Sequence, residues 1–179
     1  MAVCLHAGVE PEIIAQALGD FRGANRRLTL CGIFNGVSVV DDYAHHPTEI
    51  RATLRAARDY YKPRRMFVVF QPHQHSRTRF LLNDFAESFG VADEVIVPDI
   101  YFVRDSESER YLVDAKDLVE RIHARGRDAQ YEPDFASIVS RLYEEAQTGD
   151  LVLTMGAGNV WQVADDLLSR LSGMPDGSD

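Results

Sequence analysis

The sequence predicts an α/β fold, a Rossmann-like three-layer domain with a mostly parallel sheet of about six strands. Apolar segments of strand length alternate with amphipathic segments of helix length from residue 37 to residue 171. This alternation is typical of βαβ units, whose crossovers cover both faces of a parallel sheet with helices. Segments 66–70 and 151–155 are apolar at nearly every position, which indicates strands buried on both faces.

Composition narrows the class of protein. The chain has 179 residues, 45% of them hydrophobic and 26% charged, which fits one globular domain with a short appendage. A net charge of −9 argues against a nucleic-acid or anionic-membrane surface. No apolar run approaches the ~20 residues of a membrane span, and residues 1–10 do not form a signal peptide. Cys4 and Cys31 lack metal-ligand spacing, so we expect reduced thiols in a cytoplasmic protein.

The first 42 residues predict two helices followed by a hairpin. In residues 1–21, apolar side chains recur at spacings of three and four, with a break at Gly8. Residues 21–25 have the composition of a linker. Residues 27–42 contain two β-rich runs around Asn35-Gly36, a pair that favours a type I′ turn. We therefore expect an antiparallel edge hairpin.

The remaining chain predicts alternating helices and strands. The expected elements are helix 47–60, strand 65–70, helix 78–90, strand 94–98, helix 115–125, strand 129–131, helix 134–147, strand 151–155 and helix 160–171. Residues 99–113 are a polar, irregular excursion. The tail, residues 173–179, is rich in Gly, Pro, Ser and Asp and is expected to be disordered.

Unusual polar side chains follow three of the predicted strands. The loop after the second strand of the hairpin carries Asp42, Tyr43, His45 and His46. The loop after strand 65–70 carries Gln71, His73, Gln74, His75, Arg77 and Arg79. The loop after strand 151–155 is Gly156-Ala157-Gly158-Asn159. Because the carboxyl ends of parallel strands share one edge of a sheet, these loops predict a ligand site.

The residue types in the first loop suit a nucleotide. The Asp42 carboxylate is able to accept hydrogen bonds from ribose hydroxyls; the alternative is that it caps the turn. The rings of Tyr43 and His45 suit stacking on a base or bonding to it; the alternative for Tyr43 is simple packing. His46 precedes Pro47 and is expected to be the N-cap of the helix that Pro47 opens.

The other two loops suit an anion. Arg77 and Arg79 lie near the start of the predicted helix and would bind carboxylate or phosphate oxygens, unless they are solvated surface residues. Gly156-Ala157-Gly158-Asn159 is a weak signal that equally fits a tight strand-to-helix turn. Two histidine pairs invite a metal hypothesis, but no Cys or Glu completes a ligand set, so we expect no metal here.

Three motifs in order give the sequence a family resemblance. Asp42-Tyr43-Ala44-His45-His46-Pro47-Thr48-Glu49, Phe70-Gln71-Pro72-His73 and Gly156-Ala157-Gly158-Asn159 together resemble the C-terminal domain of Mur ligases. These ATP-dependent enzymes add amino acids to the peptidoglycan precursor. The resemblance runs from about Gly8 to about Leu171. The double histidine is most similar to members that join L-alanine to UDP-N-acetylmuramate.

The resemblance implies a division of the chain and roles for its residues. Residues 1–25 would be the helical tail of a preceding central ATP-binding domain plus a linker, and residues 26–172 the C-terminal domain. Arg27, Asp42, Tyr43, His45, Gly156 and Asn159 would bind ATP, and His73 and Arg77 would face the amino acid and the acyl phosphate. The catalytic residues would be His45, His73 and Arg77. The family usually has arginine at the position of Gln74, so one substrate contact differs in this chain.

No Gly-x-x-x-x-Gly-Lys-Ser/Thr phosphate loop occurs in the sequence. The resemblance assigns that loop and most of the Mg²⁺ binding to the central domain, and the uridine-diphosphate site to the N-terminal domain. The chain alone is therefore expected to be inactive. Two alternatives are a ligase that attaches a recycled peptide and a stand-alone, non-catalytic nucleotide-binding module.

Overall fold

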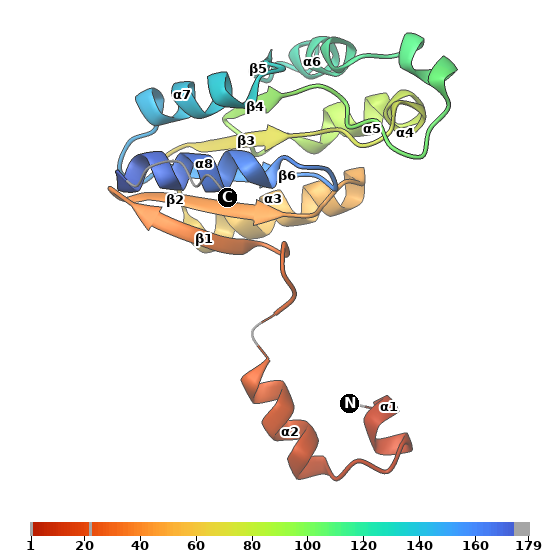
Figure 1. The fold of residues 1–179 in the computed structure, drawn as a ribbon, viewed down its shortest axis with the longest axis vertical. Helices are drawn as coiled ribbons and strands as arrows, with labels where there is room; N and C mark the ends of the chain where they lie inside the picture. The colour runs from red at the N-terminus through yellow and green to blue at the C-terminus, as the bar shows by residue number, and fades with distance from the viewer. Residues whose placement is uncertain (1, 22, 174–179) are drawn as a thin grey trace.

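The computed structural model describes residues 2–21 and 23–173, and its main feature is one six-stranded sheet (Figure 1). The strands are β1 (Thr29–Phe34), β2 (Val37–Asp42), β3 (Met66–Phe70), β4 (Glu94–Val97), β5 (Ala129–Tyr131) and β6 (Leu151–Met155). Their order is β1-β2-β6-β3-β4-β5, and only the β1–β2 pair is antiparallel. The predicted mostly parallel sheet with an antiparallel edge hairpin is confirmed.

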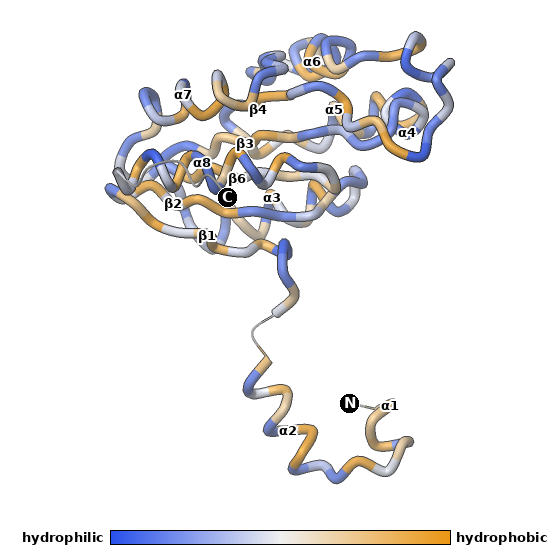
Figure 2. Tube along the Cα trace, in the orientation of Figure 1, coloured by the Kyte–Doolittle hydropathy of each residue, from blue (hydrophilic) through white to orange (hydrophobic). Residues whose placement is uncertain are grey.

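Helices cover both faces of the sheet and give it three layers. The helices α3 (Pro47–Tyr61), α5 (Leu82–Ser88) and α6 (Ala115–His123) pack on one face; α7 (Phe135–Glu145) and α8 (Trp161–Ser172) pack on the other. Each face has its own apolar cluster, and the central strands contribute alternate side chains to both clusters. Hydrophobic residues accordingly run along the central strands in Figure 2.

The edge hairpin forms as its turn residues predict. Asn35 (φ 51°) and Gly36 (φ 77°) are both left-handed, as a type I′ turn requires. A Cβ atom on Gly36 would lie 2.7 Å from Thr148 Cγ2, so glycine also allows the turn to pack on the loop before β6. One register shift between Leu30 and Gly32 marks a bulge in β1.

The predicted helix 78–90 is wrong in both its start and its continuity. The chain instead forms α4 (His75–Phe80) and α5, which are separated at Leu81 (φ −108°, ψ 16°). Asp105, which lies 29 residues after Ser76, accepts a hydrogen bond from the Ser76 backbone N–H at 2.9 Å. This distant carboxylate stabilises an earlier helix start that no local pattern encodes. Elsewhere the predicted ends differ by one or two residues.

Two short helices precede the sheet. They are α1 (Ala2–His6) and α2 (Pro11–Asp20), and Gly8 (φ 79°) separates them as predicted. Figure 1 shows the pair apart from the sheet, connected to it by an extended segment. The side chains of Val3, Ile13 and Leu18 are 80%, 59% and 56% exposed. Assignment of residues 1–25 to a preceding domain is therefore a proposal that such exposed apolar surface supports.

At the other end, Gly173 (φ 69°) ends α8 as a left-handed cap. The predicted disordered tail, 173–179, otherwise lies outside the described residues. None of the helices within residues 2–21 and 23–173 has the length and apolar character of a bilayer-spanning segment.

Hydrogen exchange tests the proposed boundary at residue 25. We expect fast amide exchange in α1 and α2, because these helices bury almost no side chains, and slow exchange in β3 and β6, which are buried throughout. Equal protection of α2 and β6 would contradict the boundary and show that the helices belong to this domain.

Candidate functional site

Strand register brings the three predicted loops together. In the β2–β6 pair Asp42 is opposite Met155, and in the β6–β3 pair Met155 is opposite Phe70. The three strands therefore end at the same level, and their loops begin side by side at the carboxyl edge. We call this set of loops the edge site; it comprises residues 42–46, 71–77 and 156–159.

Four aromatic rings form a row across the edge site. The ring centroids of Tyr43 and His45 are 5.3 Å apart, those of His45 and His73 are 6.1 Å apart, and those of His73 and Tyr101 are 5.7 Å apart. The last pair is stacked, with an interplanar angle of 21°. Tyr101 comes from the excursion after β4 and was not predicted as a site residue; its position just past a strand end is the signal that could have found it.

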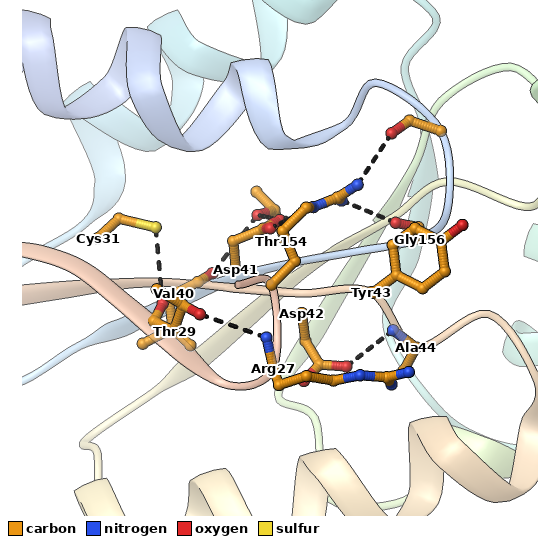
Figure 3. A network of polar contacts seen from close by, with 12 residues as sticks. Arg27, Thr29, Cys31, Val40, Asp41, Asp42, Tyr43, Ala44, Thr154 and Gly156 are labelled. Carbon is orange, nitrogen blue, oxygen red and sulfur yellow. Dashed lines mark hydrogen bonds and ion pairs between the residues drawn. The ribbon is translucent and has the colours of Figure 1, made fainter. Parts of the chain in front are cut away.

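The Asp42 carboxylate is buried and bonded within the chain. It accepts a hydrogen bond from Ala44 N at 2.8 Å (Figure 3). It also accepts hydrogen bonds from Leu28 N at 2.7 Å and from Thr53 Oγ1 at 3.3 Å. Its side chain is only 3% exposed, so in this structure it fixes the loop to the segment before β1 and to α3. The predicted contact between Asp42 and a ribose stays a prediction.

The two arginines before β1 have different surroundings. Arg26 Nε lies 2.7 Å from Asp41 Oδ2, and Arg26 Nη2 donates to Gly156 O at 2.8 Å. Arg26 therefore joins β2 to the β6 loop, a structural role that sequence reasoning missed. Arg27, the predicted ATP contact, is exposed, and its guanidinium makes no ion pair or hydrogen bond within the described residues; it lies 5.8 Å from the Tyr43 ring centroid.

These surroundings fit the nucleotide role proposed for Arg27 and Tyr43. A guanidinium without an ion-pair partner is available to phosphate oxygens, and Tyr43, which is 37% exposed, offers an aromatic ring to a ligand. In the described parts of the chain, no three side chains of His, Cys, Asp or Glu lie close enough to hold a metal ion. The expectation that this loop set binds no metal stays a prediction.

His45 and His46 point to different partners. His45 Nδ1 lies 3.1 Å from Tyr43 O and 3.6 Å from Glu49 Oε2, which leaves Nε2 for a ligand. His46 Nδ1 accepts a hydrogen bond from Thr48 N at 3.3 Å, so His46 is the N-cap of α3, as predicted.

His73 and Arg77 form the polar centre of the second loop. Arg77 Nη1 lies 3.4 Å from His73 Nδ1. Burial lowers the pKa of His73, and the positive charge of Arg77 lowers it further, with smaller contributions from His45 and Arg104. His73 is therefore a neutral imidazole at pH 7, able to accept a proton.

Of the two predicted anion-binding arginines, only Arg77 is available. Arg79 donates from Nε and Nη2 to the two Glu109 carboxylate oxygens at 3.0 and 3.1 Å, which neutralises it. Both arginines lie in the last turn of α4 rather than at its start, because α4 begins at His75. The predicted position of the two arginines near the start of the helix is therefore wrong, and Asp105 accepts a hydrogen bond at that end.

The glycine turn is shaped by close packing on Gln71. A Cβ atom on Gly156 (φ 144°) would lie 2.6 Å from Gln71 O, and one on Gly158 would lie 2.3 Å from Gln71 Oε1 and 2.8 Å from Tyr101 Cγ. Gln71 Nε2 donates to Asn159 Oδ1 at 3.1 Å. The turn thus holds Tyr101 against His73. The predicted ATP contacts of Gly156 and Asn159 stay predictions.

Comparison with known proteins places this geometry in a family. The family model described as "Mur ligase, glutamate ligase domain" matches residues 26–158, which include all of the edge site except Asn159. The chain belongs to the Mur ligase family. The resemblance seen in the three motifs is confirmed.

Curated Mur ligases and solved Mur ligase structures extend the match. The chain is 48% identical over 170 residues to UDP-N-acetylmuramate–L-alanine ligase of Caldanaerobacter subterraneus subsp. tengcongensis, covering 95% of this chain and 36% of the relative. It is 45% identical to the enzyme of that name from Acetivibrio thermocellus, covering 94% and 35%. The chain thus spans about a third of the length of these relatives.

Two solved structures share the fold. UDP-N-acetylmuramate-alanine ligase MurC from Thermotoga maritima is 24% identical with a TM-score of 0.74, covering 96% of this chain and 36% of that one. A murein peptide ligase from Psychrobacter arcticus is 26% identical with a TM-score of 0.72, covering 97% and 35%. The three-layer architecture is therefore that of Mur ligase C-terminal domains.

Substitution of Gly158 tests the packing that positions the row of rings. Gly158→Ala should displace Tyr101 or Gln71 and lower the free energy of unfolding by ~1–3 kcal/mol, as overpacking does. Thermal or urea unfolding of the 179-residue chain measures this. Gly90→Ala is the matched control, because its Cβ atom would meet open space; equal stability of the two variants would contradict the close contact.

Proposed function

We propose that this chain is the C-terminal domain of an ATP-dependent ligase that joins L-alanine to UDP-N-acetylmuramate in peptidoglycan precursor synthesis in the cytoplasm. The observation that carries the proposal is the 45–48% identity, over 94–95% of the chain, to proteins with that name. The edge site supports it, because it combines an aromatic nucleotide surface with a neutral imidazole and an unpaired guanidinium.

The two ends of the row of rings bind different substrates. Arg27, Tyr43 and His45 bind the nucleotide, with Asp42 and the 156–159 turn holding that end in place. His73 and Arg77 face the amino acid: the guanidinium binds a carboxylate, and the neutral imidazole accepts the proton that an attacking amino group must lose. ATP, with Mg²⁺, supplies the phosphoryl group that activates the acceptor carboxylate as an acyl phosphate.

The remaining parts of the reaction belong to other domains of the same polypeptide. Since no phosphate loop occurs in these 179 residues, we assign that loop and most of the Mg²⁺ binding to a central domain. UDP-N-acetylmuramate would bind mainly to an N-terminal domain. Residues 1–25 would connect this domain to the central one, and no nucleic acid or membrane partner is proposed.

A second candidate is a ligase that attaches a recycled peptide. It is favoured by the structural match to the murein peptide ligase, whose identity of 26% is similar to the 24% of the Thermotoga maritima MurC structure. The identity of 45–48% to curated L-alanine ligases favours the first candidate. A stand-alone nucleotide-binding module is the third, and the pair of His73 and Arg77 argues against it, because nucleotide binding alone needs no proton acceptor beside a carboxylate-binding arginine.

Substrate choice in the complete ligase tests the proposal. We expect phosphate release from ATP and UDP-N-acetylmuramate to depend on L-alanine, with little release when a peptide that begins with L-alanine replaces it. The isolated 179-residue chain should release none. Faster turnover with the peptide would favour the recycling ligase, and turnover by the isolated chain would contradict the division among domains.

Arg77→Ala tests the amino-acid side of the site. Removal of a half-buried charged donor should lower kcat/KM for L-alanine by about one to two decades. Because the charge of Arg77 lowers the pKa of His73, its loss should raise that pKa and move the acid limb of the pH–rate profile to higher pH. Gln74→Ala should cost less than about one decade, because Gln74 is neutral and bonds only to backbone.

Arg55→Ala is the matched control for Arg77→Ala. Arg55 is an exposed arginine of α3 outside the edge site, so its loss should leave kcat/KM and the pH profile unchanged. If Arg77→Ala behaves like this control, or if Gln74→Ala is as damaging as Arg77→Ala, the assignment of the carboxylate to Arg77 is wrong.

A further inference from the structure

The segment between β4 and α6, residues 98–113, carries an arginine to which the proposed function gives no role. This residue is Arg104, which is exposed and has a left-handed backbone (φ 49°). Non-glycine residues adopt this conformation at a cost, and such positions are concentrated at functional sites.

Backbone contacts fasten the segment to the second loop of the edge site. Tyr101 exchanges backbone hydrogen bonds with the residues on either side of His73, at 2.8 and 3.0 Å. The Gln74 side-chain amide lies 3.3 Å from both the Val103 and Arg104 carbonyl oxygens. The backbone of Arg104 is thus held directly beside the loop that carries His73.

The nearby carboxylates are already bonded to other groups. Asp105 accepts hydrogen bonds from Ser76 N at 2.9 Å and from Ser106 N at 3.2 Å. Glu109 pairs with Arg79, and Glu107 pairs with Arg110. The Arg104 guanidinium itself makes no ion pair or hydrogen bond in the part of the chain that the structure describes.

The positive charge of Arg104 acts electrostatically on His73. The groups that act on His73 are Arg77 on α4, His45 in the first loop and Arg104, and each lowers the pKa of His73 after the larger effect of burial. Within the described residues, neither Arg77 nor Arg104 has a carboxylate partner, and both act on one imidazole in a protein of net charge −9. Positive charge left without an internal partner suits an anionic ligand.

We propose that Arg104 is a second anion-binding side chain of the edge site, which acts with Arg77 on carboxylate or phosphoryl oxygens of the substrates. The idea rests on the proposed function for the identity of those substrates. Gln74 takes part through its amide, which holds the Arg104 carbonyl and so directs this part of the segment toward the site. Since Gln74 is neutral, Arg104 supplies charge that residue 74 does not.

Anion binding to the 179-residue chain tests the proposal without any need for ligase activity. The His73 imidazole resonances report binding, with inorganic phosphate and L-alanine titrated in separate arms to distinguish a phosphoryl group from a carboxylate. Arg104→Gln should weaken the binding of phosphate, of L-alanine or of both by roughly 10- to 100-fold, the effect of losing a hydrogen bond to a charged group. The pKa of His73 should rise in the same variant, because a nearby positive charge is removed.

Two further variants make the result specific to charge. Arg127→Gln removes an exposed arginine before β5, at the opposite edge of the sheet. It should leave the binding of both phosphate and L-alanine unchanged. Arg104→Lys keeps the charge and should retain part of the binding. Unchanged binding in Arg104→Gln, or equal losses in the Gln and Lys variants, would overturn the proposal.

Kinetics of the complete ligase give the second test. Arg104→Gln should raise the KM for L-alanine or UDP-N-acetylmuramate by roughly 10-fold or more, and adding Gln74→Arg should restore it by returning a guanidinium beside His73. An unchanged KM in Arg104→Gln, or a raised KM that Gln74→Arg does not lower, would also overturn the role of Arg104. An inactive wild-type enzyme would instead contradict the proposed function and leave the anion-binding test standing.

Discussion

The register of three parallel strands is the constraint on which the rest of this site depends. Because Asp42, Met155 and Phe70 lie opposite one another, the loops after β2, β6 and β3 start at one level. A shift of one residue in either pair would turn every side chain of a strand to the other face and separate the loops. The apolar clusters on both faces fix this register, since each central strand is buried along its whole length. The core thus determines the position of the polar edge.

Glycine and buried carboxylates then shape the loops on that edge. Gly156 and Gly158 let the β6 turn approach Gln71 and Tyr101 more closely than any Cβ atom would allow. Asp41 and Asp42 are both buried, and they bond to Arg26 and to backbone N–H groups rather than to solvent. Such fully bonded buried groups are costly to disturb, so the loops that carry Tyr43 and His45 have little freedom. A site with a rigid support needs little reorganisation when a ligand binds.

Several arginines of this acidic chain hold the fold together, whereas three near the edge site have no carboxylate partner in the part of the chain that the structure describes. Arg64 and Arg65 both bond to the buried Asp150, and Arg79 bonds to Glu109. Within the described residues, the guanidinium groups of Arg27, Arg77 and Arg104 have no carboxylate partner; Arg27 lies near the Tyr43 ring and Arg77 near His73. Arg55 and Arg127 also have none among these residues, but they lie outside the edge site. A net charge of −9 does not prevent anion binding when positive charge is gathered locally in this way.

The sequence by itself determined the elements of the fold, the edge hairpin, the three loops and the family, because each of these depends on residues close together in the chain. Asn35-Gly36 sets the turn, apolar runs set the central strands, and strands alternating with helices require a parallel sheet. Only the tertiary structure decided which polar side chains are free. Contacts such as Asp105 to Ser76, Glu109 to Arg79 and Arg26 to Gly156 join residues 29, 30 and 130 positions apart. No local pattern encodes such pairs, so the start of α4, the different roles of Arg26 and Arg27, and the place of Tyr101 beside His73 emerged only when the packed core brought those segments together.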